Sequence, residues 1–139
     1  MSDTSIDPRQ QLSQLLEGRT DQEILENLGQ LDVDETLGAI FEEMTKRFHP
    51  ERAAGQDGVV QWEILTPQGT KTFQVTIEHG TCTSEVGASK TPRVTLTLAI
   101  ADFLRFIAGT LDGMQAFMTG KLRLAGDLMF AQSMQQWFD

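Results

Sequence analysis

The chain has 139 residues, which suits one compact domain, and its hydrophobic content of 40% is ordinary for a globular protein. Its 20 acidic and 11 basic residues give a net charge of −9, which argues against nucleic acid as a partner because phosphate binding requires a basic face. The single Cys82 excludes an internal disulfide framework and, without a transmembrane-length apolar run or a secretory leader pattern, the sequence predicts a cytoplasmic protein.

Helical spacing dominates the first third of the chain. A short apolar stripe consists of Leu12, Leu15 and Leu16. Thr20 and Glu23 then have the spacing of a capping box, which predicts the start of a further helix. Asp34 is expected to cap the next helix, and Pro50 to end it, because the residue before a proline is disfavoured in helical geometry. The apolar stripe of this helix is Leu37, Ile40, Phe41, Met44 and Phe48.

The middle of the chain alternates apolar and polar residues with a period of two, as β-strands do. A hairpin connection is expected at 66–70 and a loop at 87–92, where glycine, proline and small polar residues gather. Such alternation predicts a sheet that is covered on one face and wet on the other. Counting a short segment near the C-terminus, the expected strands lie around 59–65, 71–79, 81–86, 93–98 and 121–124.

Helices are expected around the last strand. One runs from Asp102 to Ala108, a helical turn or two covers 114–118, and Asp127 is expected to cap the final helix. The order of elements is helices, four strands, helix, strand and helix. It predicts an α+β fold in which helices pack on one face of a largely antiparallel, five-stranded sheet.

The polar residues form no recognisable catalytic or metal-binding pattern. His79 and Cys82 lie three residues apart, but two ligands are too few for a metal site. No serine has the context of a nucleophile elbow, and the glycines between 109 and 126 match neither a Walker loop nor a dinucleotide fingerprint. Paired carboxylates are interpreted as solvated helix faces or caps. The sequence therefore predicts no catalytic residue, no metal and no cofactor.

Methionine and phenylalanine are concentrated near the C-terminus. Four of the six methionines fall in the last 26 residues, among several phenylalanines. Such enrichment is typical of a core, but methionine also suits irregular apolar sites that bind ligands. Composition leaves both interpretations open.

The C-terminal half resembles the sterol carrier protein 2 family. The resemblance rests on the strand Val94–Leu98, the pair Asp102-Phe103, Gly109, and the stretch from Gly113 to Asp127, which contains an Ala-Phe pair, Gly-Lys, an alternating strand and Gly-Asp. It extends back to about residue 34. Ala99 departs from the serine or threonine that often caps the following helix in that family. Residues 1–33 are interpreted as an added helical segment, and 34–139 as the family-like domain.

The resemblance implies a five-stranded sheet with an apolar tunnel between sheet and helices. It also implies that fatty acyl chains, acyl-CoA, sterols or phospholipids occupy the tunnel, with the final helix as its lid. Gln115, Thr119 and Gln132 are candidates for contact with a head group. The residues expected to line the tunnel are Phe103, Phe106, Ile107, Leu111, Met114, Phe117, Met118, Leu122, Leu124, Met129 and Met134.

Three functional hypotheses follow from this. The first is a non-enzymatic carrier that binds, and transfers, a hydrophobic small molecule. The second is an interaction or assembly module that recruits apolar substrate to a partner enzyme, or forms a homodimer through the helices of residues 1–33. The third and weakest, an enzyme acting on bound lipid, has no catalytic pattern to support it.

Overall fold

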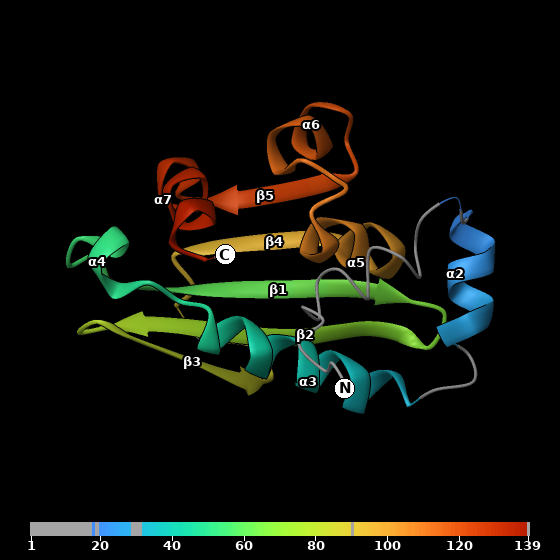
Figure 1. Ribbon diagram of the computed structural model, residues 1–139, viewed down its shortest axis with the longest axis horizontal. Coiled ribbons are helices and arrows are strands. Elements are labelled where there is room, and N and C mark those ends of the chain that lie inside the picture. The colour runs from blue at the N-terminus through green and yellow to red at the C-terminus, as the bar shows by residue number, and fades with distance from the viewer. Residues whose placement is uncertain (1–17, 19, 29–31, 90, 139) are drawn as a thin grey trace, which may run out of the picture.

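A computed structural model describes residues 18, 20–28, 32–89 and 91–138 and shows an open sheet with helices on one face (Figure 1). The strands are β1 (Gly58–Thr66), β2 (Gly69–Glu78), β3 (Thr81–Val86), β4 (Val94–Ala99) and β5 (Leu122–Gly126). The helices are α2 (Asp21–Leu28), α3 (Val33–Lys46), α4 (Pro50–Ala53), α5 (Ile100–Ala108), α6 (Gly113–Met118) and α7 (Leu128–Met134), followed by the 3-10 turn η1 (Gln135–Trp137).

Local capping explains where the first described helices begin. The Glu23 amide donates to Thr20 Oγ1 and the Thr20 amide donates to Glu23 Oε1, which confirms the predicted capping box. The prediction that Asp34 caps the next helix is wrong. Asp32 has the extended geometry of a cap and accepts from the Glu35 amide, while Asp34 pairs with Lys71 Nζ at 3.1 Å. The predicted stripe at 12–16 lies outside the described residues.

The sheet has the strand order β3-β2-β1-β4-β5. Three of its four neighbouring pairs are antiparallel, as expected, but β1 and β4 are parallel. Because β4 follows β3 at the far edge, the connection between them has to cross the sheet. It crosses the polar face, where the Ser89 amide donates to the Gln61 side chain at 3.0 Å.

The opposite face of the sheet is apolar and carries the helices. Helix α3 packs on β2 and β3, α5 on β1 and β4, and α7 on β4, as Figure 1 shows from the helical side. The buried strand residues alternate as predicted and come from four strands: Val60, Trp62, Ile64, Phe73, Val75, Ile77, Val94, Leu96, Leu98 and Leu122.

An aromatic cluster fills the space between α3, α5 and the sheet. Phe41 stacks on Phe73 with ring centroids 4.6 Å apart and on Phe103 at 5.2 Å. Trp62 meets Phe41 and Phe103 edge-on, at 5.8 and 5.5 Å. Offset and edge-to-face pairs of this kind add to the free energy gained from burial alone. Helix α3 supplies the central ring of this cluster, Phe41.

An apolar cavity beneath the C-terminal helices as candidate functional site

The region between the sheet and the C-terminal helices holds a narrow apolar cavity. Its floor comes from β1, β4 and β5, and its cover from α5, the α5–α6 connection, α6 and α7. The volume is only about 10 Å³, because the lining side chains pack against one another. The ten lining residues are Trp62, Leu96, Leu98, Phe106, Leu111, Ala116, Leu122, Leu124, Met134 and Gln135.

Helix α6 covers the cavity with small side chains. The Asp112 carboxylate caps it by accepting from the Gln115 amide at 3.0 Å. Its buried residues are only Gly113 and Ala116. A Cβ at Gly113 would lie 2.7 Å from the Gln135 side chain, so glycine lets α6 approach the end of α7 closely. Its larger side chains are only partly covered, with Met114 45%, Phe117 39% and Met118 78% exposed.

Helix α7 is fixed at its start by Asp127 and Arg93. The Asp127 carboxylate accepts from the Phe130 amide and from Arg93 Nε, both at 3.0 Å. The Phe130 amide, followed by Arg93, lowers the pKa of the Asp127 carboxyl. The Arg93 guanidinium also lies 4.2 Å from the centre of the Phe130 ring, a cation–π contact. These contacts confirm Asp127 as the N-cap.

The structure brings together five of the residues predicted to line a tunnel. Phe106, Leu111, Leu122, Leu124 and Met134 all border the cavity. Phe103 is buried in the aromatic cluster, and Ile107 packs against the core. The other four side chains are exposed: Met114, Phe117, Met118 and Met129. The three head-group candidates, Gln115, Thr119 and Gln132, are also exposed.

Sequence reasoning missed the floor of the cavity. Trp62, Leu96 and Leu98 were expected on the covered face of the sheet but were not assigned to a site. They converge because β1 and β4 pair in parallel, with Trp62 opposite Leu96 and Ile64 opposite Leu98. The sequence shows that these residues alternate toward the covered face, but it does not show that β1 pairs with β4.

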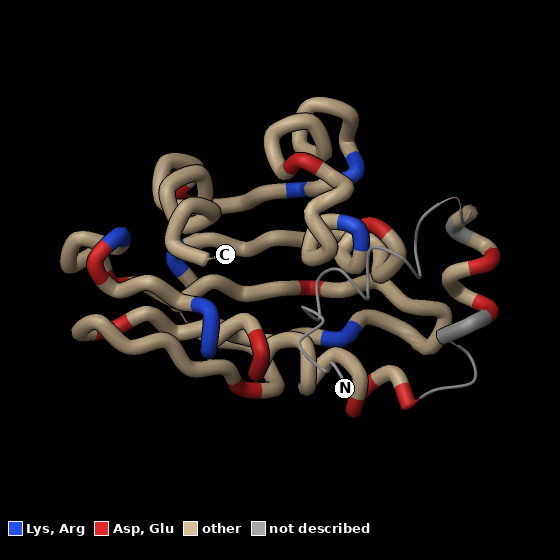
Figure 2. Tube along the Cα trace, viewed as in Figure 1, with Lys and Arg blue, Asp and Glu red and all other residues tan. Residues whose placement is uncertain are grey.

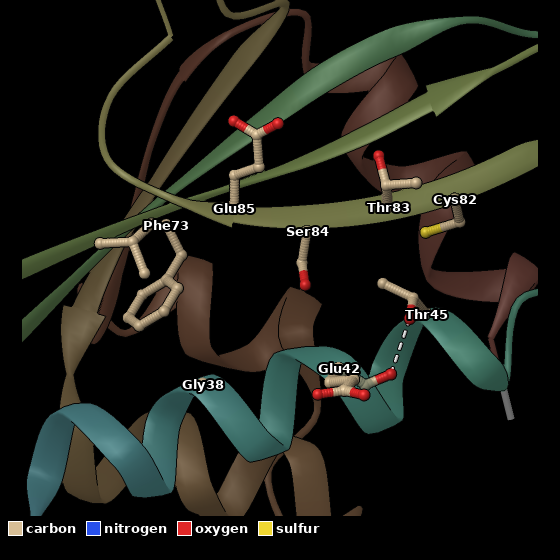
Figure 3. A pocket seen from close by; sticks show the side chains of 9 residues that line it. Gly38, Glu42, Thr45, Phe73, Cys82, Thr83, Ser84 and Glu85 are labelled. Carbon is tan, nitrogen blue, oxygen red and sulfur yellow. Dashed lines mark hydrogen bonds between the residues drawn. The ribbon is translucent and has the colours of Figure 1, made fainter.

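A larger groove of about 430 Å³ lies elsewhere, between α3 and the edge strand β3 (Figure 3). Phe73 and Cys82 contribute apolar surface, but Glu42 adds a carboxylate, and in Figure 3 Ser84 points toward α3. Burial raises the pKa of the Cys82 thiol to about 12, so it stays protonated and is a poor nucleophile at neutral pH. Mixed polarity makes this groove less suited to an apolar ligand than the cavity.

The described residues contain no cluster of three or more histidine, cysteine or carboxylate side chains that could hold a metal ion. None of their helices is both long and apolar enough to cross a membrane.

Two curated relatives match this chain in sequence. The chain is 28% identical over 96 residues to peroxisomal multifunctional enzyme A of Dictyostelium discoideum and 33% identical over 82 residues to peroxisomal multifunctional enzyme type 2 of Mus musculus. These matches cover 68% and 57% of this chain. The chain spans only 20% and 11% of the two enzymes.

A solved relative of similar size is sterol carrier protein 2 like 2 from Aedes aegypti. Its crystal structure has a TM-score of 0.64 and 25% identity, over 76% of this chain and 98% of that one. A solution structure of the palmitated Aedes protein has a TM-score of 0.58 and 26% identity, over 70% and 88% of the two chains. The model of the SCP-2 sterol transfer family matches residues 40–139. The chain therefore belongs to the SCP-2 sterol transfer family.

Proposed function

We propose that this protein binds a hydrophobic ligand between the sheet and the C-terminal helices, and that it does not transform it. The observation that carries the proposal is the cavity, whose lining side chains are apolar except for Gln135, with the Trp62 indole among them. Each CH₂ group removed from water gains about 0.8 kcal/mol, so an acyl chain is held without many polar contacts. The palmitated Aedes relative supports a fatty acyl chain as the first ligand to test.

Binding requires the cavity to widen, because ligand pockets usually measure about 300–1,000 Å³. Helix α6 is the element best suited to move. Its only fully buried residues are Gly113 and Ala116, and its larger side chains are already partly exposed, so moving α6 exposes less apolar surface than moving α5, which has five buried residues. The proposed site thus opens by separation of α6 from α7 and β5, while the aromatic cluster stays packed.

The test is displacement of a fluorescent fatty acid by lauric or palmitic acid. Leu124→Asp places a carboxylate on the lining and should weaken binding at least about tenfold, because a buried charge without a partner is costly. Leu65→Asp is the matched control, since this leucine is 45% exposed and lies on the opposite face of the sheet. Unchanged affinity in a folded Leu124→Asp protein would contradict the proposed site.

A second candidate function is that of a module within a larger assembly. It is favoured by the two curated relatives, which are multifunctional enzymes many times longer than this chain. In this role the N-terminal segment forms a homodimer or contacts a partner enzyme. Ile24 of α2 is buried in the core, so a truncation has to end before α2. Light scattering of the full chain and of a chain lacking residues 1–17 separates the roles: loss of a dimer with retained ligand binding assigns the segment to assembly.

The cellular location belongs to this proposal as well. We propose the cytoplasm, whereas both curated relatives are named as peroxisomal. Imaging of the tagged protein in its own cells tests this, and a location inside an organelle would contradict it.

A further inference from the structure

The indole nitrogen of Trp62 is a buried hydrogen-bond donor without a partner. The Trp62 side chain lies in the middle of β1 and is 2% exposed. Within the described part of the chain, no acceptor lies in hydrogen-bond range of its Nε1 atom. Buried tryptophans usually satisfy this donor, because an unmet buried N–H keeps the full cost of its desolvation. An exception in the centre of a sheet therefore requires an explanation.

The Trp62 side chain has two kinds of neighbour, aromatic rings and the cavity. Its ring packs edge-on against Phe41 and Phe103 and is tilted against Phe106, with centroids 6.0 Å apart. These aromatic rings hold the indole in place but offer no oxygen. Trp62 also borders the cavity, next to Leu96 on β4. A molecule in the cavity can supply an acceptor without disturbing the sheet or the aromatic cluster.

We propose that the Trp62 indole N–H donates a hydrogen bond to an oxygen of the bound ligand. The ligand is then an amphiphile with a hydroxyl, ester or protonated carboxyl oxygen, rather than a pure hydrocarbon. Its oxygen lies against the sheet, and its hydrocarbon part extends toward the C-terminal helices. This orientation differs from one in which Gln115, Thr119 or Gln132 binds the head group, since all three are exposed. The inference rests on the proposed function, because it requires a ligand in this cavity.

The indole N–H resonances give a direct test in the wild-type protein. The chain has two tryptophans, Trp62 and Trp137, and spectra of Trp137→Phe assign the two signals. Lauric acid should move the Trp62 indole proton strongly downfield, as a new hydrogen bond does, whereas n-decane should not. The inference is overturned if lauric acid displaces a fluorescent fatty acid but leaves the Trp62 signal where n-decane leaves it.

Affinity gives the second measurement. Trp62→Phe keeps an aromatic ring but removes the donor, and it should weaken lauric acid binding about twofold to tenfold. Trp137→Phe is the control, because Trp137 is also buried but does not border the cavity. Equal losses in both variants would overturn the inference. If lauric acid does not displace the probe even from the wild type, the proposed function itself fails, which is a different outcome.

A second inference rests on the exposed apolar side chains of α6 and α7. Of the seven large hydrophobic side chains that the described residues expose, five lie on these two helices: Met114, Phe117, Met118, Leu128 and Met129. On α6, positions 114, 117 and 118 share one face, and the buried residues are Gly113 and Ala116. Helices of globular domains normally turn their larger apolar residues inward, and clustered exposed ones mark a contact surface.

Two basic residues follow the exposed face of α6. Lys121 and Arg123 follow α6, are exposed, and form no ion pair within the described residues. From residue 113 to 126 the chain carries no carboxylate. Figure 2 shows the basic bands after α6 and on β5, and an acidic band where α6 begins. In a chain of net charge −9, this corner is a local exception.

We propose that the outer face of α6 and the α6–β5 corner dock on an anionic lipid bilayer. The apolar side chains enter the interfacial region, and Lys121 and Arg123 contact the charged head groups. Docking at this place brings the cover of the cavity to the membrane. It does not depend on ligand binding and is measured without a ligand.

Vesicle flotation tests docking. The protein should float with vesicles of equimolar phosphatidylcholine and phosphatidylglycerol, and much less with phosphatidylcholine alone. Replacing both Phe117 and Met118 by serine should lower binding at least about tenfold, and Lys121→Gln about fivefold. Val86→Ser is the matched control, because Val86 and Met118 are both 78% exposed but lie near opposite edges of the sheet.

Three results would overturn the docking proposal. The wild type fails to float with anionic vesicles, Val86→Ser loses as much binding as the double variant, or the double variant binds unchanged. A wild-type dimer in light scattering that the double variant converts to monomer would assign the face to self-association instead.

Discussion

The two ends of the helical layer are packed in different ways. Around α3, large rings interlock: Phe41 contacts Phe73, Trp62 and Phe103 within 5.8 Å. Around α6, the fully buried residues are glycine and alanine, while Phe117 is 39% and Met118 78% exposed. The α3 end therefore has more apolar burial to lose than the α6 end. A protein that has to admit a ligand without unfolding benefits from this division.

The largest expected effect tests the stability of the α3 end. Phe41→Ala removes the central ring of the aromatic cluster and should lower the free energy of unfolding by about 3–5 kcal/mol. Phe117→Ala on α6 should change it by less than about 1 kcal/mol, because the ring is already partly in water. Urea titration of both variants measures the difference. Similar losses would show that the two ends are equally packed.

A smaller effect is expected at the junction of β5 and α7. Gly126→Ala should cost about 2–3 kcal/mol, because residue 126 has φ +109° and an added Cβ would lie 2.5 Å from the Arg93 carbonyl oxygen. Gly69→Ala is the control, with the same φ but no atom within 4 Å of the added Cβ. The additional loss of unfolding free energy at residue 126 measures the close contact alone. Equal losses in the two variants would mean that backbone strain accounts for the whole effect.

The third prediction concerns how easily α6 opens. Asp112→Ala removes the cap of α6 and should cost at most about 1 kcal/mol of global stability. Amide hydrogen exchange in α6 should accelerate clearly, while that in α5 stays unchanged, since local opening follows local packing. Equal acceleration in both helices would mean that the cover and the core open together.

The smallest effect is a dependence on pH at the start of α7. The pKa of Asp127 is lowered in the folded protein, so its stabilising contribution is present above its ordinary value of 3.8 and is lost as the pH falls through the lower folded value. Asp127→Asn keeps a capping side chain but removes the charge. The unfolding temperature should therefore fall less between pH 7 and pH 3 in the variant than in the wild type. An identical fall in both proteins would show that Asp127 does not cause it.

Most elements were predictable because their signals are local. Four strands alternate in the sequence as their side chains alternate in the sheet, and the capping residues at Thr20 and Asp127 bond to amides three residues away. At Asp34 the local signal was ambiguous. Two carboxylates stand two residues apart, and in the structure Asp32 caps the helix while Asp34 pairs with Lys71.

The site was less predictable, because it combines residues from separate strands. Phe106, Leu122 and Met134 were expected in the tunnel and border the cavity. Trp62 and Leu96 were not assigned to it, since the parallel pairing of β1 and β4 leaves no local mark. The exposed Met118 and Met129 have the same hydrophobicity as a buried methionine, and only packing separates the two situations.

By itself, the sequence determined the α+β class, the positions of the five strands and the family, because periodicity, caps and motifs act over a few residues. Only the tertiary structure decided the parallel placement of β4, the cavity floor around Trp62 and the outward face of α6. These depend on which strands pair and which faces meet, and both follow from burying the most apolar surface across the whole chain.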